Sequence, residues 1–257
     1  MSILYDVKDR VAQITIDRPG SMNAIDQASA VELERIWADL ETRNDVSCVV
    51  LTGSGERAFS VGADMKDNSL SGLEYWGSLN PNGFGGIAFR ESFDIPLIAR
   101  VNGYALGGGF EMVLGADIVI ASDNAQFGLP EGRVGRLPMA GGMTLLQRKI
   151  PHNLAMGMML TGRRVKAADM ATYGIVNEVV PQADLDSAVE SWVEDVLANA
   201  PLSLKAMKQT ANRTGHLTPT QAQAMKLPAI MKAVNSEDSQ EGVKAFVEKR
   251  APVWRGC

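Results

Sequence analysis

Two glycine-containing turns supply backbone amides that could stabilise a negatively charged oxygen. The first turn spans residues 59–66 (FSVGADMK), and the second spans residues 102–111 (NGYALGGGFE), with glycines at 107, 108 and 109. Ordered glycines inside an element cost roughly 0.5–1 kcal/mol each relative to alanine. At a helix start their N–H groups have no partner in the helix and lie at its positive end. One amide from each turn could therefore form an oxyanion hole. Close packing of a helix on a strand would also explain the three glycines, and Gly62-Ala63 alone could be an ordinary tight turn.

Two glutamates follow predicted strands and could perform acid–base chemistry. Glu111 lies in the first turn of the predicted helix, where its neighbours Phe110 and Met112 are apolar, so the helix should be buried. A lone buried carboxylate is unfavourable unless it is paired or functional. Glu131 ends a later strand-like segment. Two neighbouring carboxylates would repel each other, which favours one protonated group near neutral pH. A solvated charge at the helix start and a plain loop carboxylate are the alternative interpretations.

The chain has few residues that could form a catalytic triad, a metal site or a nucleotide-binding motif. The two histidines, His152 and His216, lie where surface or helix-capping residues are expected, which leaves little room for a Ser-His-Asp triad or a histidine metal site. The phosphate, dinucleotide, zinc-protease and nucleophile-elbow motifs are absent. Cys48 and Cys257 are too few for a disulfide framework and lack zinc spacing. We therefore expect no metal, and backbone amides and carboxylates are the remaining resources.

Composition indicates an ordinary globular protein. The chain has 257 residues, 46% of them hydrophobic, with 25 Lys and Arg against 30 Asp and Glu, a net charge of −5. This acidity argues against a partner such as nucleic acid or a membrane surface. The first ten residues lack the apolar core of a signal peptide, and no stretch approaches 18 apolar residues. We expect a soluble, cytoplasmic protein.

The elements that would position these residues alternate between strand and helix. Residues 11–16 predict a strand, Asp26 is a suitable N-cap for a helix over about 27–42, and a second strand covers 48–52. Residues 67–86 show neither the periodicity of a helix nor the alternation of a strand, and they predict a long irregular loop, of the kind that is often functional. The aromatic residues of this loop (Tyr75, Trp76 and Phe84) could cover a ligand or only pack the loop.

The second half begins as an α/β core and ends in helices. A strand at 97–101, a glycine turn, a short helix at 108–116 and a strand at 117–121 indicate a core built in successive turns. After about residue 141 the pattern becomes nearly all helical, with a capping box at Thr218. This part could be a second lobe or an oligomerisation arm.

Three motifs in the same order resemble the enoyl-CoA hydratase/isomerase (crotonase) superfamily, and the likeness extends over essentially the whole chain. They are residues 62–66 (GADMK), 101–111 (VNGYALGGGFE) and 125–131 (AQFGLPE). Within the superfamily, Phe110-Glu111, residues 159–164 and residues 252–256 look most like carnitinyl-CoA dehydratases and related hydratases.

The resemblance implies an α/β fold and an assembly. Residues 1–190 would form a spiral of ββα turns containing the active site, and residues 191–257 a helical trimerisation region. The chain would form a homotrimer or a dimer of trimers. An enoyl-CoA or acyl-CoA thioester would be the substrate, with no further cofactor.

The resemblance also implies roles for individual residues. The amides of Ala63 and Gly108 match the oxyanion hole for the thioester carbonyl, and Glu111 and Glu131 match the carboxylate pair of the hydratases. The substrate-binding positions would be Ala63, Asp64, Met65, Lys66, Gly108 and Met139. Family hydratases often have Gly at the last position and carnitinyl-CoA dehydratases tend to have Asp, so Met139 makes this pocket more apolar than the carnitine-type site.

The resulting hypothesis is an enoyl-CoA hydratase. Glu111 would take a proton from water attacking C3, and Glu131 would supply a proton to C2. The alternatives are a carnitinyl-CoA dehydratase, a Δ3,Δ2-enoyl-CoA isomerase that uses one glutamate, a non-catalytic acyl-CoA binder and an RNA-binding member of the family.

Overall fold

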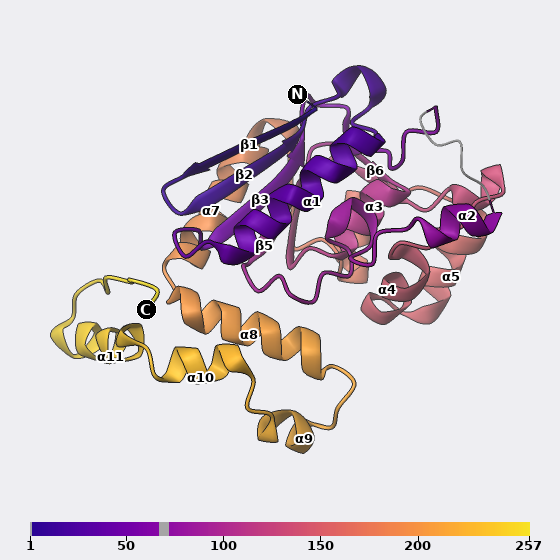
Figure 1. Cartoon of the computed structure of the whole chain (residues 1–257). Coiled ribbons are helices and arrows are strands. Elements are labelled where there is room, and N and C mark those ends of the chain that lie inside the picture. Colours follow the sequence, from indigo (N-terminus) through magenta and orange to yellow (C-terminus); the bar gives the residue numbers. More distant parts are fainter. Residues whose placement is uncertain (1, 67–71) are drawn as a thin grey trace.

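The computed structural model describes residues 2–66 and 72–257 and contains two sheets surrounded by helices (Figure 1). The six-stranded sheet has the order β1-β2-β3-β5-β7-β10, and the four-stranded sheet has the order β4-β6-β8-β9. The strands of the large sheet are β1 (Ile3–Lys8), β2 (Val11–Ile16), β3 (Cys48–Gly53), β5 (Leu97–Val101), β7 (Ile118–Ser122) and β10 (Glu178–Val180). Those of the small sheet are β4 (Ala58–Ser60), β6 (Tyr104–Leu106), β8 (Gln126–Gly128) and β9 (Val165–Lys166).

The large sheet is covered on both faces, which explains its apolar strands. Apart from the antiparallel β1–β2 hairpin, its neighbours pair in parallel. Every residue of β3 is buried. Because side chains alternate along a strand, Val49 and Leu51 join the core formed with α1 (Gln27–Thr42), whereas Cys48 and Val50 pack with α7 (Leu185–Leu197). Figure 1 shows α1 in front of the sheet and α7 behind it.

Each long parallel strand leads into a short strand of the second sheet. β3 is followed by β4, β5 by β6 and β7 by β8, and β6 then leads into α3 (Gly108–Leu114). The short strands β4, β6 and β8 pair in parallel, so their carboxyl ends lie side by side. The predicted α/β core built in successive turns is confirmed. Because the two glycine turns follow β4 and β6, this arrangement brings them together.

The remaining helices form two groups. The first group, which lies between β4 and β10 in the chain, comprises α2 (Gly72–Gly77), α4 (Gly142–Lys149), α5 (His152–Thr161) and α6 (Ala167–Tyr173). The described 3-10 turns are η1 (Pro19–Ser21), η2 (Phe84–Gly86), η3 (Glu131–Val134) and η4 (Gln182–Asp184). The C-terminal group extends away from the sheets (Figure 1) and comprises α8 (Pro201–Thr214), α9 (Pro219–Ala224), α10 (Pro228–Val234) and α11 (Glu237–Glu248).

Lys208 attaches this C-terminal group to the core. Its ammonium lies 2.7 Å from the Asp117 carboxylate and donates to the Ile95 carbonyl at 2.7 Å. Residue 190, where the sequence analysis divides the chain, falls within α7, a helix that packs on the sheet. The helices after α7 carry exposed apolar residues, among them Phe246 of α11, which is 85% exposed.

Several predicted elements are confirmed and one prediction, the long irregular loop, is wrong. The strand at 11–16 and the helix at 27–42 have the expected bounds, and the Asp26 carboxylate accepts the Ser29 amide as an N-cap. The capping box at Thr218 is also present. The predicted loop at 67–86 contains α2 and η2, while residues 67–71 lie outside the described residues. The nearly all-helical part after 141 contains β9 and β10, short strands whose partners β8 and β7 come from earlier in the chain.

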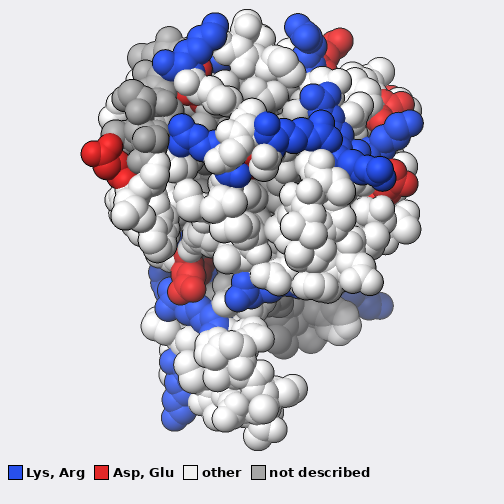
Figure 2. Space-filling view, turned by 90° about the vertical axis from the view of Figure 1, so that its right-hand side faces the viewer, with Lys and Arg blue, Asp and Glu red and all other residues white. Residues whose placement is uncertain are grey.

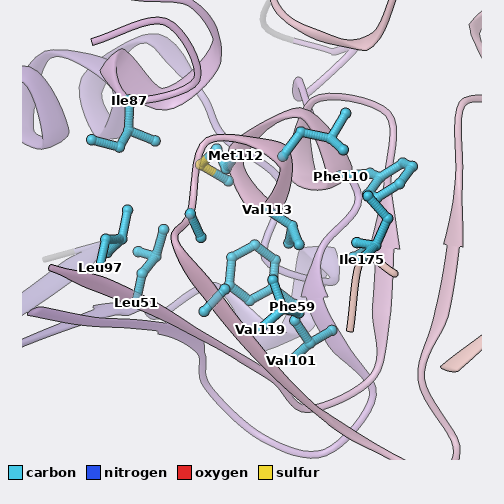
Figure 3. Close-up of a cluster of buried hydrophobic side chains, with 14 of the residues drawn as sticks. Leu51, Phe59, Ile87, Leu97, Val101, Phe110, Met112, Val113, Val119 and Ile175 are labelled. Carbon is cyan, nitrogen blue, oxygen red and sulfur yellow. The ribbon is translucent and has the colours of Figure 1, made fainter. Parts of the chain in front are cut away.

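Helix α3 is held rigidly because all seven of its residues are buried. Phe110, Met112 and Val113 project into the core, where Phe59 and Leu51 approach from the strands (Figure 3). The helix also approaches β4 so closely that a Cβ at Gly109 would overlap the Ser60 carbonyl oxygen. Glycine at this position is therefore a requirement of close backbone packing.

We expect Gly109→Ala to lower the free energy of unfolding by about 1–3 kcal/mol, because the added methyl group meets backbone that cannot rotate away. Urea unfolding monitored by circular dichroism measures the change. Gly157→Ala is the matched control, since this glycine lies inside α5 with open space around it. The free energy of unfolding of this control variant should rise by about 0.4–1 kcal/mol. Equal behaviour of the two variants would contradict the close approach.

Candidate active site

The two glycine turns are in contact. Gly62 has a φ of +90°, and a Cβ on it would lie 2.7 Å from the Gly108 amide nitrogen. The first turn is fixed to the start of α1 by an isolated bridge, in which the Ile25 amide donates to the Gly62 carbonyl and the Asp64 amide donates to the Ile25 carbonyl, both at 2.8 Å. The bridge leaves out the Ala63 amide.

The second turn presents the start of α3. Gly107 has a φ of +54°, and its amide donates to the Gly128 carbonyl at 2.9 Å. Gly108 is the first residue of α3, and the first amides of a helix have no partner within it. Ala63 and Gly108 both line one cavity of about 360 Å³. The structure therefore brings the two predicted amide-bearing residues to the same cavity.

Glu111 and Glu131 line this same cavity. Glu111 is only 3% exposed, and its Oε1 accepts a hydrogen bond from the Gly142 amide at 2.8 Å. Glu131 begins η3, with Oε1 3.0 Å from the position that a Cβ on Gly107 would take. Its Oε2 is buried and has no hydrogen-bond partner within residues 2–66 and 72–257. The four groups that the sequence singled out thus surround one space.

Burial makes both carboxyls poor acids. The pKa of Glu111 is raised to about 7, mainly by burial and in addition by the nearby charge of Glu131, against hydrogen bonds from the backbone at Gly142 and Ala140 that lower it. Burial also raises the pKa of Glu131 to about 6. Both groups therefore titrate near neutrality, where an acid–base pair is effective.

A second cavity of about 500 Å³ adjoins the first. The two share Ala63, Tyr75, Phe84 and Ala140, so the rings of Tyr75 and Phe84 lie at their boundary. Trp76, by contrast, is 63% exposed. Of the alternatives left open for these aromatic residues, lining a cavity applies to the first two.

The predicted substrate-binding residues separate into three groups. Met65 and Met139 line the 360 Å³ cavity together with Ala63 and Gly108. Asp64 lines the adjoining cavity, and its carboxylate lies 3.0 Å from the Arg18 guanidinium. Lys66 is exposed and is not among the described residues that line either cavity.

Sequence reasoning missed Gly142 and three cavity-lining arginines, Arg133, Arg136 and Arg164. The pair Gly141-Gly142 at a helix start was a usable signal for the amide that binds Glu111, because the same logic identified Gly108. The arginines lie in η3, in the turn after it and in the segment after α5, where no periodicity predicts a direction.

Other predictions concern groups outside this cavity. His152 and His216 are exposed, as expected. Within the described part of the chain, no three Asp, Glu, His or Cys side chains gather as a metal site would require. None of the described helices combines the length and apolar character needed to cross a membrane.

Comparison with known proteins gives one consistent result. The family model for enoyl-CoA hydratase/isomerase matches residues 6–257. The carnitinyl-CoA dehydratases of Shigella flexneri and Escherichia coli K12 are each 36% identical over 250 residues, which is 96% of this chain and 95% of theirs.

Solved structures agree with these sequence matches. The enoyl-CoA hydratase from Bacillus anthracis superposes with a TM-score of 0.91 at 30% identity and covers all of both chains. That from Mycobacterium tuberculosis H37Rv gives 0.90 at 31% identity, over 100% of this chain and 99% of the other.

We expect Glu111→Gln to stabilise the fold at pH 8 and to leave it unchanged at pH 4. The wild-type carboxyl is protonated in both states below its ordinary pKa. Between that value and about 7 only the unfolded chain ionises, so stability falls as pH rises, and above about 7 the difference stays constant. The gain at pH 8 should reach about 3 kcal/mol at most.

Urea unfolding at both pH values measures this difference. Glu194→Gln is the control, because Glu194 is an exposed residue of α7. A gain for Glu111→Gln that is the same at pH 4 and pH 8 would show that ionisation of the buried carboxyl is not its cause.

Proposed function

Because the chain belongs to the enoyl-CoA hydratase/isomerase family, we propose that it adds water reversibly across the 2,3 double bond of an enoyl-CoA thioester. The observation that supports this proposal most is a pair of carboxyls, the buried Glu111 and the half-buried Glu131, on the cavity that Ala63 and Gly108 line. Such a hydro-lyase needs one group to accept a proton and another to donate one. Acyl-CoA is the substrate in this proposal, and no cofactor enters it.

The amides of Ala63 and Gly108 would bind the thioester oxygen. Addition of water at C3 makes an enolate, whose negative charge develops on that oxygen. The Gly108 amide lies at the positive end of α3, which favours an anion there. Because both amides belong to backbone held by the Ile25–Ala63 bridge and by the buried α3, they need little rearrangement during the reaction.

We assign the base to Glu111 and the acid to Glu131. Glu111 accepts the Gly142 amide, a hydrogen bond that stabilises the carboxylate form. Glu131 has a buried oxygen without a described partner, as suits a carboxylic acid that waits for an acceptor. The higher pKa of Glu111 in the free protein opposes this assignment, so the single variants must decide it. In dehydration these roles are reversed: Glu131 would accept the proton from C2, and Glu111 would donate a proton to the leaving hydroxyl group.

A second candidate is the dehydration of carnitinyl-CoA, which the 36% identity to carnitinyl-CoA dehydratases favours. It would use the same four groups. Isomerase activity needs one carboxyl rather than two, so the presence of both Glu111 and Glu131 favours hydration. The homotrimeric or hexameric assembly and the cytoplasmic location stay predictions, and the exposed apolar residues of α11 support the former.

The two single variants should have opposite pH dependence. In Glu131→Gln, the residual hydration of crotonyl-CoA should rise with pH, because Glu111 must be ionised, with a midpoint below about 7 since the charge of Glu131 is gone. In Glu111→Gln, activity should fall as pH rises through about 6, because Glu131 must be protonated. Each should lower kcat by about 10²–10⁴.

Loss of the conjugated thioester absorbance measures hydration from pH 5 to pH 9. If activity instead fell with pH in Glu131→Gln and rose with pH in Glu111→Gln, Glu131 would be the base and Glu111 the acid. If both variants kept activity within threefold of wild type, the carboxyl mechanism itself would be wrong.

The contribution of the Gly108 amide can be isolated in a background that makes room for a side chain. The Phe84 ring occupies the space where a Cβ on residue 108 would lie, so Phe84→Ala comes first. In the Phe84→Ala background we would compare Gly108→Pro, which lacks the backbone N–H, with Gly108→Ala, which keeps it. The proline variant should have about 10²–10³ lower kcat than the alanine variant in crotonyl-CoA hydration.

Circular dichroism would establish that both double variants are folded. Equal kcat values would show that the Gly108 amide does not stabilise the transition state.

A further inference from the structure

Positively charged side chains line part of the 360 Å³ cavity. Three arginines line it, Arg133, Arg136 and Arg164, and we call them the arginine rim. They come from η3, the turn after it and the segment after α5, three places that the fold brings to one cavity. Figure 2 shows Lys and Arg side chains gathered in a band on the side of the molecule where α2 and α5 lie.

Each guanidinium of the rim is oriented by the fold. Arg136 lies over the ring of Tyr75, with its Cζ 4.9 Å from the ring centre, and Arg164 lies over the ring of Tyr104 at 5.0 Å. Arg133 donates from Nη2 to the Thr161 carbonyl at 3.1 Å. Stacking uses the face of a guanidinium, so the N–H groups at the edge of Arg164 keep the geometry that matches a carboxylate.

The rim is separate from the acid–base pair. No described ion pair joins its arginines to Glu111 or Glu131. The raised pKa values of the two glutamates have burial, backbone hydrogen bonds and the charge of Glu131 as their causes, and no arginine is among these causes. The rim therefore has a role other than tuning the catalytic carboxyls.

The direction of the substrate follows from the cavity that the carboxyls occupy. Glu111 and Glu131 would act on C2 and C3 of the acyl group, so the acyl chain extends from Ala63 and Gly108 into the 360 Å³ cavity. The CoA portion then leaves by the adjoining cavity, whose charged lining residues are Asp26 and Asp64. Met139 and Leu137 line this cavity together with the rim, so they are available to contact the acyl chain.

We propose that the preferred substrate is a 2-enoyl-CoA whose acyl chain ends in a carboxylate, bound by the arginine rim. This inference rests on the proposed hydratase function and specifies its substrate class. Charge-assisted hydrogen bonds from guanidinium to carboxylate are among the stronger polar contacts, and they are geometrically specific. The positive charges of the arginine rim would repel a quaternary ammonium, so crotonobetainyl-CoA should be a poor substrate.

The test compares two substrates of nearly the same shape in the full-length enzyme. One is 5-carboxypent-2-enoyl-CoA, and the other is 6-methylhept-2-enoyl-CoA, whose branched end replaces the carboxylate by an isopropyl group. We expect wild-type kcat/KM to be about tenfold or more higher for the carboxylate substrate. Arg164→Gln and Arg136→Gln should each remove most of this preference and leave the rate on the neutral substrate within about twofold.

Arg163→Gln is the matched control. It removes the same charge from the residue next to Arg164, but Arg163 is not among the described residues that line the cavity. Equal losses on both substrates in Arg164→Gln and Arg136→Gln would assign the rim to the CoA phosphates and overturn the proposal. A wild-type preference for the neutral substrate, or an equal effect of Arg163→Gln, would overturn it as well.

A binding measurement distinguishes failure of this inference from failure of the hydratase proposal. Adipoyl-CoA and 6-methylheptanoyl-CoA are saturated and cannot be hydrated, so calorimetric dissociation constants report recognition alone. Tighter binding of adipoyl-CoA that Arg164→Gln abolishes would support the rim even if no enoyl-CoA were hydrated. Hydration of 6-methylhept-2-enoyl-CoA without any preference for adipoyl-CoA in binding would overturn the rim and keep the hydratase.

Discussion

The close contact between the backbone after β4 and the start of α3 is the constraint on which the site depends. Gly62 approaches the Gly108 amide, and Gly109 lies against the Ser60 carbonyl. These contacts require glycine because a Cβ would separate the two segments. The parallel pairing of β4 with β6 brings the segments together, and the buried residues of α3 hold the helix in place. Without this approach Ala63 and Gly108 would not share a cavity.

Burial of two carboxyls near one another is the second constraint, and it opposes stability. The fold satisfies only part of their hydrogen-bonding capacity. Gly142 donates to Glu111, while one oxygen of Glu131 has no described partner. Such an arrangement persists when the surrounding core is strong enough to impose it. Here both flanking elements join the main core, through Phe110 next to Glu111 and through Leu129 shortly before Glu131.

The sequence predicted those parts of the site that depend on local backbone chemistry. The triple glycine and the capped helix starts have short-range causes, so Gly108, Glu111 and the helix after Asp26 could be recognised from their neighbours. Glu131 and Ala63 acquired their roles mainly from the resemblance to a family, because a loop carboxylate and a tight turn are common. Helix α2, strands β9 and β10 and the arginines could not be predicted, since their positions depend on partners far away in the chain.

Family membership and substrate choice therefore rest on different parts of the molecule. Three of the four groups proposed for chemistry belong to α3 and to the backbone joined to β4, which the core fixes, and the fourth, Glu131, begins η3. The arginine rim lies on η3 and on connecting segments, where substitution disturbs less of the core. A fold of this kind can keep one reaction while the acyl group changes. The 36% identity to carnitinyl-CoA dehydratases is compatible with this division, because whole-chain identity counts many core positions and few at the rim. The charged residues that line the cavity are consequently a better guide to the acyl group than overall similarity.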